Sequence, residues 1–273
     1  MTSIYEVLRD AIRADEPVAL ATVIGGPSLG AKLLLRPNEA PLGSLGDPEL
    51  DRVVARDAMA ELEAGRTGIR HYGERGQTLA DEEEVKTQVD VFVESFARLP
   101  QMIIFGAVDF TAALARVAKV LGFRVIVCDA REVFATTRRF PMADEVVVDW
   151  PNRLLERVGP ELGPRDAVCI LTHDPKFDVP AIQGALKTRV GYIGVMGSRR
   201  THEKRMARLA EVGVTDAADL ARIMAPIGLD IGARSPEETA ISICAEIIST
   251  RTGRAAPSLR DSTGAIHPQF GHP

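Results

Sequence analysis

The sequence predicts an α/β protein whose C-terminal part is a Rossmann-like, doubly wound parallel sheet and whose N-terminal part is a smaller α/β domain. After residue 101, short apolar segments alternate with amphipathic helical patterns, which is typical of a parallel sheet with helices on both faces. The chain has 273 residues, of which 45% are hydrophobic, enough for two cores of modest size. Residues 98–100 resemble a linker, so we expect domains at 1–98 and 99–251 and a mobile tail at 252–273.

The N-terminal domain is expected to begin with a helix at residues 3–14, because Ser3 and Glu6 form a capping-box pattern. The apolar run 18–24 predicts a buried strand. Within the polar stretch 65–84, the acidic run 81–84 predicts a solvated loop. The other elements expected in this domain are a return strand at 32–36, a turn-rich segment at 38–48, a helix at 49–62 and a strand within 85–96.

The C-terminal domain is expected to hold five parallel strands, each a short and strongly apolar run. Its last helix, at 236–250, is predicted by a serine cap, a proline in the first turn and a capping-box glutamate. The expected strands are 102–105, 124–129, 145–149, 167–172 and 190–195, with a helix at 109–121.

Composition and charge exclude several classes of protein. The net charge of −5 argues against a nucleic-acid partner, which usually requires a basic face. The three cysteines, Cys128, Cys169 and Cys244, have apolar neighbours, so we expect them in the core and expect neither a disulfide framework nor a zinc site. The sequence has no signal-peptide pattern and no apolar run of membrane-spanning length. It therefore indicates a cytoplasmic protein without a membrane span.

Candidate site residues follow the predicted strands, because ligands of open parallel sheets bind beyond the carboxyl ends of the strands. The first candidates are Gly106, after the first strand, and Asp129, at the offset typical of a ribose-binding acid. The remaining glycines of a dinucleotide fingerprint are missing, and Val108 and Asp109 stand where a pyrophosphate would approach. This loop disfavours NAD(P) and leaves two interpretations: a different ligand, or a fold that carries none.

A second candidate is Thr172-His173-Asp174, at the end of an apolar strand. The imidazole of His173 suits acid–base chemistry or metal binding. The alternative is a turn in which Asp174 caps the next helix. A serine-hydrolase interpretation has no support, because the nucleophile-elbow motif is missing from the sequence.

A third candidate is the segment 197–205, which begins with Gly197-Ser198-Arg199-Arg200 and ends at Arg205, where small residues follow a strand and open a helix. Residues 199–208 contain five basic residues and one acidic residue, a local charge of 5 − 1 = +4. The positive end of a helix dipole together with arginines favours an anion site. The alternative is a solvated basic helix face. A fourth candidate is Asp230, in the glycine-containing loop 225–233, for which two interpretations stay open: contact with a ligand or with Arg199, or a cap or turn role.

Several short motifs together resemble the XdhC/CoxI family of accessory proteins for xanthine dehydrogenase and carbon monoxide dehydrogenase. The resemblance covers most of residues 17–251. Its motifs are Ala19-Leu20-Ala21-Thr22-Val23, Gly30-Ala31-Lys32, Ile104-Phe105-Gly106-Ala107, Leu171-Thr172-His173-Asp174, Gly197-Ser198-Arg199-Arg200 and Pro226-Ile227-Gly228-Leu229-Asp230-Ile231-Gly232-Ala233.

The resemblance implies a maturation factor for molybdenum hydroxylases. Such a protein would bind molybdenum cofactor (molybdopterin), support its sulfuration by a cysteine desulfurase, and insert it into a molybdenum hydroxylase apo-enzyme, without catalysis of its own. A homodimer is plausible for such a protein. The matching residues are Lys32, Thr172, His173, Asp174, Ser198, Arg199 and Asp230. Many members carry a Gly-Gly-Cys segment for which this chain has residues 43–49, without a cysteine.

Two other functions stay open at the level of sequence. The strand pattern and Asp129 are compatible with an NAD(P)-dependent oxidoreductase. A purely structural partner of a hydroxylase complex is the third interpretation, and its binding would not depend on Arg199 and Arg200.

Overall fold

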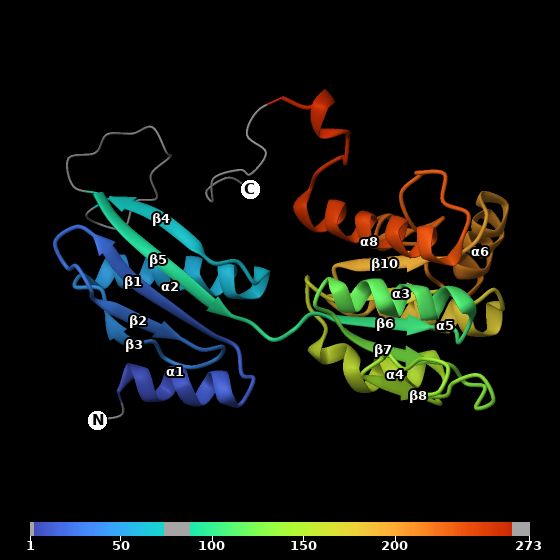
Figure 1. Ribbon diagram of the computed structural model, residues 1–273, viewed down its shortest axis with the longest axis horizontal. Coiled ribbons are helices and arrows are strands. Elements are labelled where there is room, and N and C mark those ends of the chain that lie inside the picture. Colours follow the sequence, from blue (N-terminus) through green and yellow to red (C-terminus); the bar gives the residue numbers. More distant parts are fainter. Residues whose placement is uncertain (1–2, 74–87, 264–273) are drawn as a thin grey trace. The chain divides into compact units, whose positions relative to one another are not determined.

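The computed structural model describes residues 3–73 and 88–263 and contains two compact units (Figure 1). The first unit runs to Arg98 and includes the described residues from Pro257 on, and the second is Leu99–Ala256. Each unit has a sheet and hydrophobic clusters of its own. The α/β class predicted from the sequence is confirmed in both units.

The first unit contains an antiparallel sheet with one helix against each face. Its strand order is β3-β2-β1-β5-β4. Every neighbouring pair among these strands is antiparallel. The elements are α1 (Ile4–Arg13), β1 (Val18–Gly25), β2 (Lys32–Leu35), β3 (Leu42–Ser44), α2 (Pro48–Ala64), β4 (Gly68–Gly73) and β5 (Gln88–Phe96).

Side-chain alternation along the strands explains why both faces of this sheet are covered. On β1, Ala19, Ala21 and Val23 belong to the cluster beneath α2. Val18 and Leu20 belong to the cluster beneath α1. Successive side chains of a strand point to opposite faces, so a continuous apolar run is the expected signature of a strand buried on both sides.

The second unit contains a six-stranded parallel sheet in the order β11-β10-β9-β6-β7-β8. Read from β8, this is the 3-2-1-4-5-6 order of a doubly wound fold. Strands are added on one side of β6 up to β8, and from β9 on they are added on its other side. The strands are β6 (Gln101–Phe105), β7 (Arg124–Cys128), β8 (Glu145–Val147), β9 (Ala167–Ile170), β10 (Tyr192–Val195) and β11 (Ile223–Met224).

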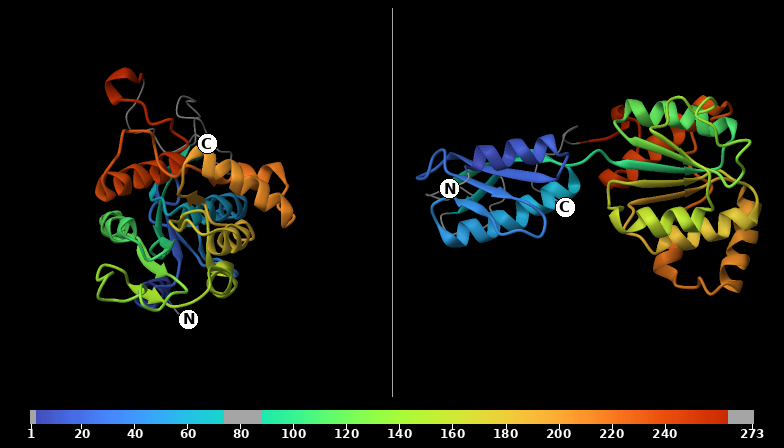
Figure 2. Two further views of the ribbon diagram at one scale, coloured as in Figure 1. Left: turned by 90° about the vertical axis from the view of Figure 1, so that its right-hand side faces the viewer. Right: turned by 90° about the horizontal axis from the view of Figure 1, so that it is seen from below.

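Helices cover both faces of this parallel sheet (Figure 2). One cluster packs α3 (Asp109–Val120) and α8 (Pro236–Thr252) on one face, and a second cluster packs α4 (Pro151–Val158) and α5 (Pro175–Leu186) on the other. On β6, Met102 and Ile104 face the first cluster, and Ile103 and Phe105 face the second. The remaining helices of this unit are η1 (Gly159–Glu161), α6 (Arg199–Glu211) and α7 (Ala217–Ala221), and η2 (Leu259–Asp261) follows it in the chain.

The predicted elements are found with ends that differ by at most two residues, apart from the strand within 85–96, whose described part is β5. The three cysteines are buried and free, as predicted. The sequence analysis missed the short strands β3, β4 and β11. The acidic run 81–84 lies outside the described residues, as do residues 264–273 of the predicted tail.

None of the helices formed by residues 3–73 and 88–263 combines the length and the apolar character that a bilayer span requires.

Replacing Ile104 by alanine is expected to lower the free energy of unfolding of the second unit by about 2–5 kcal/mol, because the deletion leaves a cavity in the central strand. Ile104 is fully buried. Ile241→Ala is the matched control, because Ile241 is 54% exposed and its truncation is expected to change the free energy by less than about 0.5 kcal/mol. Chemical denaturation of both variants measures the difference, and equal losses would contradict the proposed packing of β6.

Candidate functional site

The parallel arrangement places four of the predicted residues at one edge of the sheet of the second unit. Gly106 follows β6 and Asp129 follows β7 directly, and Thr172 and Gly197 come two residues after β9 and β10. The carboxyl ends of parallel strands meet at the same edge, so these positions line the same side of the sheet. We call this group of positions the carboxyl edge.

Gly106 allows the loops after β6 and β9 to approach each other closely. Its φ angle is +108°, in the region that favours glycine. A Cβ atom at position 106 would lie 2.9 Å from Thr172 Cγ2 and 3.1 Å from Thr172 N. The Thr111 hydroxyl of α3 donates to the Gly106 carbonyl. Any side chain at position 106 would therefore separate the two loops.

Asp129 holds the loop after β6 in place. Its Oδ2 accepts from Ala107 N at 2.8 Å. Arg131 donates to the same carboxylate through Nε at 2.9 Å and Nη2 at 2.7 Å. Burial by itself would raise the pKa of Asp129, but these hydrogen bonds outweigh it, and the pKa lies below its ordinary value of 3.8. The carboxylate predicted from the sequence to face a ribose is thus already engaged by protein donors.

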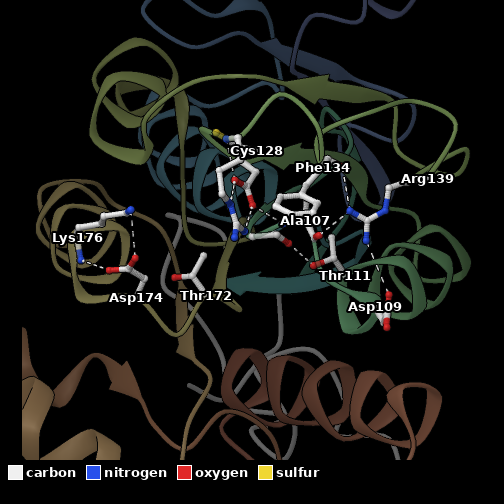
Figure 3. Close-up of polar contacts among 12 residues, drawn as sticks. Ala107, Asp109, Thr111, Cys128, Phe134, Arg139, Thr172, Asp174 and Lys176 are labelled. Carbon is white, nitrogen blue, oxygen red and sulfur yellow. Dashed lines mark hydrogen bonds and ion pairs between the residues drawn. The ribbon is translucent and has the colours of Figure 1, made fainter.

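Arg139 fixes the segment between β7 and β8 against the loop after β6 (Figure 3). Its Nη1 donates to the carbonyls of Ala107, at 3.0 Å, and Phe134, at 3.2 Å. The Arg131 guanidinium lies 4.6 Å from the Phe134 ring centroid. Arg131 thus contacts both the Asp129 carboxylate and the Phe134 ring, and Arg139 connects the Phe134 carbonyl to the loop after β6.

A buried polar network connects β9, α5, α6 and β10. The Thr172 hydroxyl donates to Asp178 Oδ1. Arg205 Nη2 donates to Asp178 Oδ2 at 3.0 Å and to the Met196 carbonyl at 2.9 Å. The side chains of Arg205 and Asp178 are 3% and 5% exposed. Thr172 is therefore anchored, and its hydroxyl is not free at the surface.

His173 and Asp174 lie at the surface, where α5 begins. Asp174 is the N-cap of α5, and its side chain accepts from Lys176 N at 3.1 Å. That backbone hydrogen bond is the main reason why the pKa of Asp174 is lowered. In Figure 3, Asp174 and Lys176 lie on one side of Thr172, and Thr111 and Asp109 lie on the other. Asp174 thus has the capping role that the sequence analysis left open.

The start of α6 has the features predicted for an anion site. Ser198 is the N-cap and accepts from Thr201 N at 3.1 Å. Ser198, Arg199 and Arg200 are exposed, and the first turn of α6 has no acidic residue. The first N–H groups of a helix have no partner within the helix and carry the positive end of its dipole. The exposed arginines and these N–H groups can together bind an anionic oxygen.

The loop 225–233 is attached to α8 and β10 through Glu246. Glu246 Oε2 accepts from Tyr192 Oη at 2.5 Å and from Gly228 N at 2.8 Å. Asp230 is exposed in this loop. Lys32 belongs to the first unit, at the start of β2, where its Nζ donates to Thr22 Oγ1 at 3.0 Å. The structure thus brings the other predicted residues onto one unit and leaves Lys32 on the other.

The described residues offer neither a metal-binding group nor a reactive thiol. Among them, no cluster of three His, Cys, Asp or Glu side chains is arranged to hold a metal ion. Burial raises the pKa of Cys128 and of Cys244 to about 12 and raises that of Cys169 well above its ordinary value. None of the three cysteines is therefore a thiolate near neutral pH.

Sequence reasoning missed three charged residues that organise the site, Arg131, Arg139 and Asp178, and it named Arg205 in the basic segment without predicting its burial. One signal was available for Arg205, which lies four residues before the buried Leu209 and so on the apolar stripe of α6. A charged residue on an apolar stripe indicates a buried ion pair. No pattern in the sequence indicated the inward orientation of Arg131 or Arg139.

Comparison with known proteins identifies relatives of both units. Residues 102–247 match the model of the XdhC Rossmann domain, and residues 11–73 match that of the XdhC and CoxI family. A protein from Bacillus subtilis, described as a probable subunit of xanthine dehydrogenase, is 34% identical over 162 residues, which are 59% of this chain and 46% of that protein.

A molybdenum cofactor insertion chaperone from Escherichia coli, PaoD, is 36% identical over 85 residues, which are 31% of this chain and 26% of that protein. The chain thus spans less than half the length of these two relatives. A crystal structure described as a xanthine dehydrogenase from Bacillus halodurans has a TM-score of 0.52 and 23% identity, and the match covers 94% of this chain and 98% of that one. At this identity the likeness supports the fold alone.

The substitution Asp129→Asn is expected to lower the free energy of unfolding by about 1–3 kcal/mol at neutral pH, because the amide loses charge-assisted hydrogen bonds to Arg131. The folded-state pKa of Asp129 is lowered, so its carboxylate stabilises the fold above the ordinary value of 3.8, and this contribution is lost as the pH falls through the folded-state pKa. Denaturation of both proteins across this range should show a difference that shrinks in acid.

Asp109→Asn is the control for this prediction, because the Asp109 side chain is 91% exposed. It is expected to change the free energy of unfolding by less than about 0.5 kcal/mol. A difference between Asp129→Asn and the unmodified chain that does not change with pH would contradict the role of the Asp129 charge.

The three cysteines are expected to react with a thiol-specific disulfide reagent much more slowly in the native protein than after denaturation, because burial raises the pKa of each thiol and covers it. All three thiols should react once the chain is unfolded in guanidinium chloride. Rapid labelling of one equivalent in the native state would show that a thiol is accessible after all.

Proposed function

The chain belongs to the XdhC and CoxI family, and on that premise we propose that it is an accessory protein that binds molybdenum cofactor and inserts it into a xanthine dehydrogenase-type molybdenum hydroxylase. The observation that carries the proposal is the exposed start of α6, where Arg199 and Arg200 follow the N-cap Ser198 at the carboxyl edge of a domain that matches the XdhC Rossmann domain. The names of the two relatives support the cofactor and the class of partner.

The residues at the start of α6 fit the phosphate of the cofactor's pterin. A Cβ atom at Gly197 would lie 3.2 Å from Thr201 Cβ, and the φ angle of +144° favours glycine, so glycine allows the chain to pass close to the first turn before the helix begins. We propose that Arg199 and Arg200 bind phosphate oxygens together with the N–H groups of the first turn. Arginine suits this role because its planar guanidinium donates two parallel hydrogen bonds.

The remaining predicted residues take two kinds of role in this proposal. Gly106, Asp129 and Thr172 shape the carboxyl edge through the contacts described above. His173, Asp174 and Asp230 are exposed and offer polar contacts to the ring system of the cofactor. Lys32 belongs to the N-terminal domain, residues 1–98, and we assign it no contact with the cofactor in the site of the Rossmann-like domain, residues 99–251.

Sulfuration is the second part of the proposal. The bound cofactor supplies the molybdenum centre to which a cysteine desulfurase would add sulfur. This chain would hold the cofactor during that step, but it would not carry the sulfur, because its three thiols are buried and their pKa values are raised. The chain would therefore bind and position the cofactor, and the desulfurase would perform the sulfur chemistry.

The strand order of the second unit favours a second candidate, an NAD(P)-dependent oxidoreductase, because it is the order of dinucleotide-binding folds. Against this candidate, Asp129 is already paired with Arg131, and Asp109 places a carboxylate near the start of α3. A purely structural partner of a hydroxylase would bind the apo-enzyme independently of Arg199 and Arg200. Measuring the affinity of the chain for molybdenum cofactor, for NAD(P) and for the apo-enzyme separates the three functions. Size-exclusion chromatography tests the expected homodimer.

The double variant Arg199→Ala/Arg200→Ala is expected to bind molybdenum cofactor at least about tenfold more weakly than the unmodified chain, because each lost charge-assisted hydrogen bond contributes about 1.5–3 kcal/mol. Equilibrium titration of the full chain with isolated cofactor measures this, with NAD(H) and NADP(H) as comparator ligands. The matched control is Arg254→Ala/Arg260→Ala, which removes two exposed arginines that do not belong to α6.

Cofactor binding that is weakened in the first variant and unchanged in the control would support the proposed function. Tight binding of NAD(H) or NADP(H) without binding of the cofactor would overturn it in favour of the oxidoreductase. Binding of the hydroxylase without binding of the cofactor would favour the structural partner.

A further inference from the structure

Arg205 has one guanidinium nitrogen that is buried without an acceptor. The side chain is 3% exposed, and its Nη2 donates to both Asp178 and Met196. Its Nη1 is shielded from solvent and has no hydrogen-bond partner in the described part of the chain. A buried donor of a charged group that lacks an acceptor is unfavourable, and such groups are rare enough in folded proteins to indicate a missing ligand or water.

The guanidinium of Arg205 lies beside the residues that precede α6. Helical side chains lean toward the helix N-terminus, so Arg205 reaches back along the first two turns. Its Nη2 contacts the carbonyl of Met196, two residues before the N-cap Ser198. A Cβ atom at Gly197 would lie 3.5 Å from this Nη2. Position 197 is therefore next to the guanidinium, and glycine places no side chain between it and the start of α6.

His202 provides a second buried nitrogen without a partner at the same end of α6. Its Nδ1 has no hydrogen-bond partner among the described residues. His202 and Arg205 are three residues apart and so lie on the same face of the helix. Burial, followed by the charge of Arg205, lowers the pKa of His202, which agrees with the two side chains being close. Two unpaired nitrogens thus accompany the free N–H groups of the first turn.

We propose that Arg205 and His202 form a buried subsite for one oxygen of a phosphate monoester, reached past Gly197. This inference rests on the proposed function, because the phosphate would be that of the bound cofactor. A phosphate has three terminal oxygens, so one oxygen can contact Arg205 Nη1 while the others accept from the first turn of α6 and from Arg199 or Arg200.

The Asp178 carboxylate does not oppose this arrangement. It accepts from Arg205 Nη2 and from Thr172, so its charge is already paired with protein donors. The rigid fork of an arginine allows Nη2 to keep this pair while Nη1 binds a second anion. A lysine at the same position has a single ammonium group and cannot serve both partners with the same geometry.

The test is isothermal titration calorimetry of the full-length chain with inorganic phosphate and pyrophosphate. The variant Arg205→Lys is expected to bind both anions about tenfold more weakly, because a charge-assisted hydrogen bond is lost while the positive charge remains. The matched control is Arg208→Lys, the same change at an exposed position of α6, which should leave binding unchanged. Equal affinity of the unmodified chain and Arg205→Lys would overturn the subsite.

His202→Leu decides the question if Arg205→Lys does not fold, because this variant keeps the Arg205–Asp178 pair and removes the imidazole with its unpaired Nδ1. It is expected to weaken phosphate binding several-fold, and unchanged affinity would overturn the inference. Titration with molybdenum cofactor separates this result from the proposed function. Equal cofactor affinity of the unmodified chain and Arg205→Lys sinks the subsite alone, whereas phosphate binding without cofactor binding sinks the cofactor role and leaves the subsite standing.

Discussion

At the point where the sheet of the second unit reverses its winding, the loops after β6 and β9 approach so closely that only glycine fits between them. A Cβ atom at Gly106 would lie 2.9 Å from the methyl group of Thr172. This close approach determines where the neighbouring groups lie. The Ala107 N–H, directly after Gly106, reaches the Asp129 carboxylate, and Thr172 is positioned to donate to Asp178. The chemistry available at the carboxyl edge thus depends on one position at which a side chain is not tolerated.

Two ion pairs with buried carboxylates flank this point, Asp129–Arg131 with an exposed arginine and Asp178–Arg205 with a buried one, and they differ in how completely their polar groups are satisfied. The Asp129 carboxylate accepts from Ala107 N and from both the backbone and the guanidinium of Arg131, so it has little capacity for a ligand. The Asp178–Arg205 pair is complete on its acidic side but leaves one guanidinium nitrogen unpaired. Buried ion pairs add little net stability, because desolvation offsets much of their attraction. Their contribution here is to fix the orientation of the paired side chains. The hydrogen bonds of Asp129 are made to protein donors, whereas Arg205 retains one unpaired donor.

The sequence was sufficient to predict the two α/β units and most of the strands, because a strand buried on both faces is apolar throughout, as 102–105 and 125–128 are. It also placed Gly106, Asp129, Thr172 and Gly197 at one edge, since this follows from parallel topology alone. It did not predict β4, whose residues Ile69-Arg70-His71-Tyr72 have little apolar character and are held by pairing with β5. Nor did it predict which charged side chains turn inward, because the Asp178–Arg205 pair joins residues 27 positions apart. Periodicity locates helices and strands, but it contains no information on pairs formed only when the helices pack.

A carrier of a cofactor has to release what it binds, and the donor set of this chain suits that requirement. A protein thiolate that binds a metal holds it tightly, and metal binding is then coupled to release of the thiol proton. The three thiols here are buried, and burial raises the pKa of each, so the chain cannot use this kind of bond without unfolding locally. Its available contacts are exposed arginines, a helix N-terminus and a single buried guanidinium nitrogen, all of which bind through charge and hydrogen bonds. Interactions between exposed charges weaken with ionic strength and are readily exchanged for those of a competing anion site. In the proposed role, a partner enzyme that offers more hydrogen-bond donors to the phosphate than α6 does would therefore be able to remove the cofactor. No covalent bond would have to be broken.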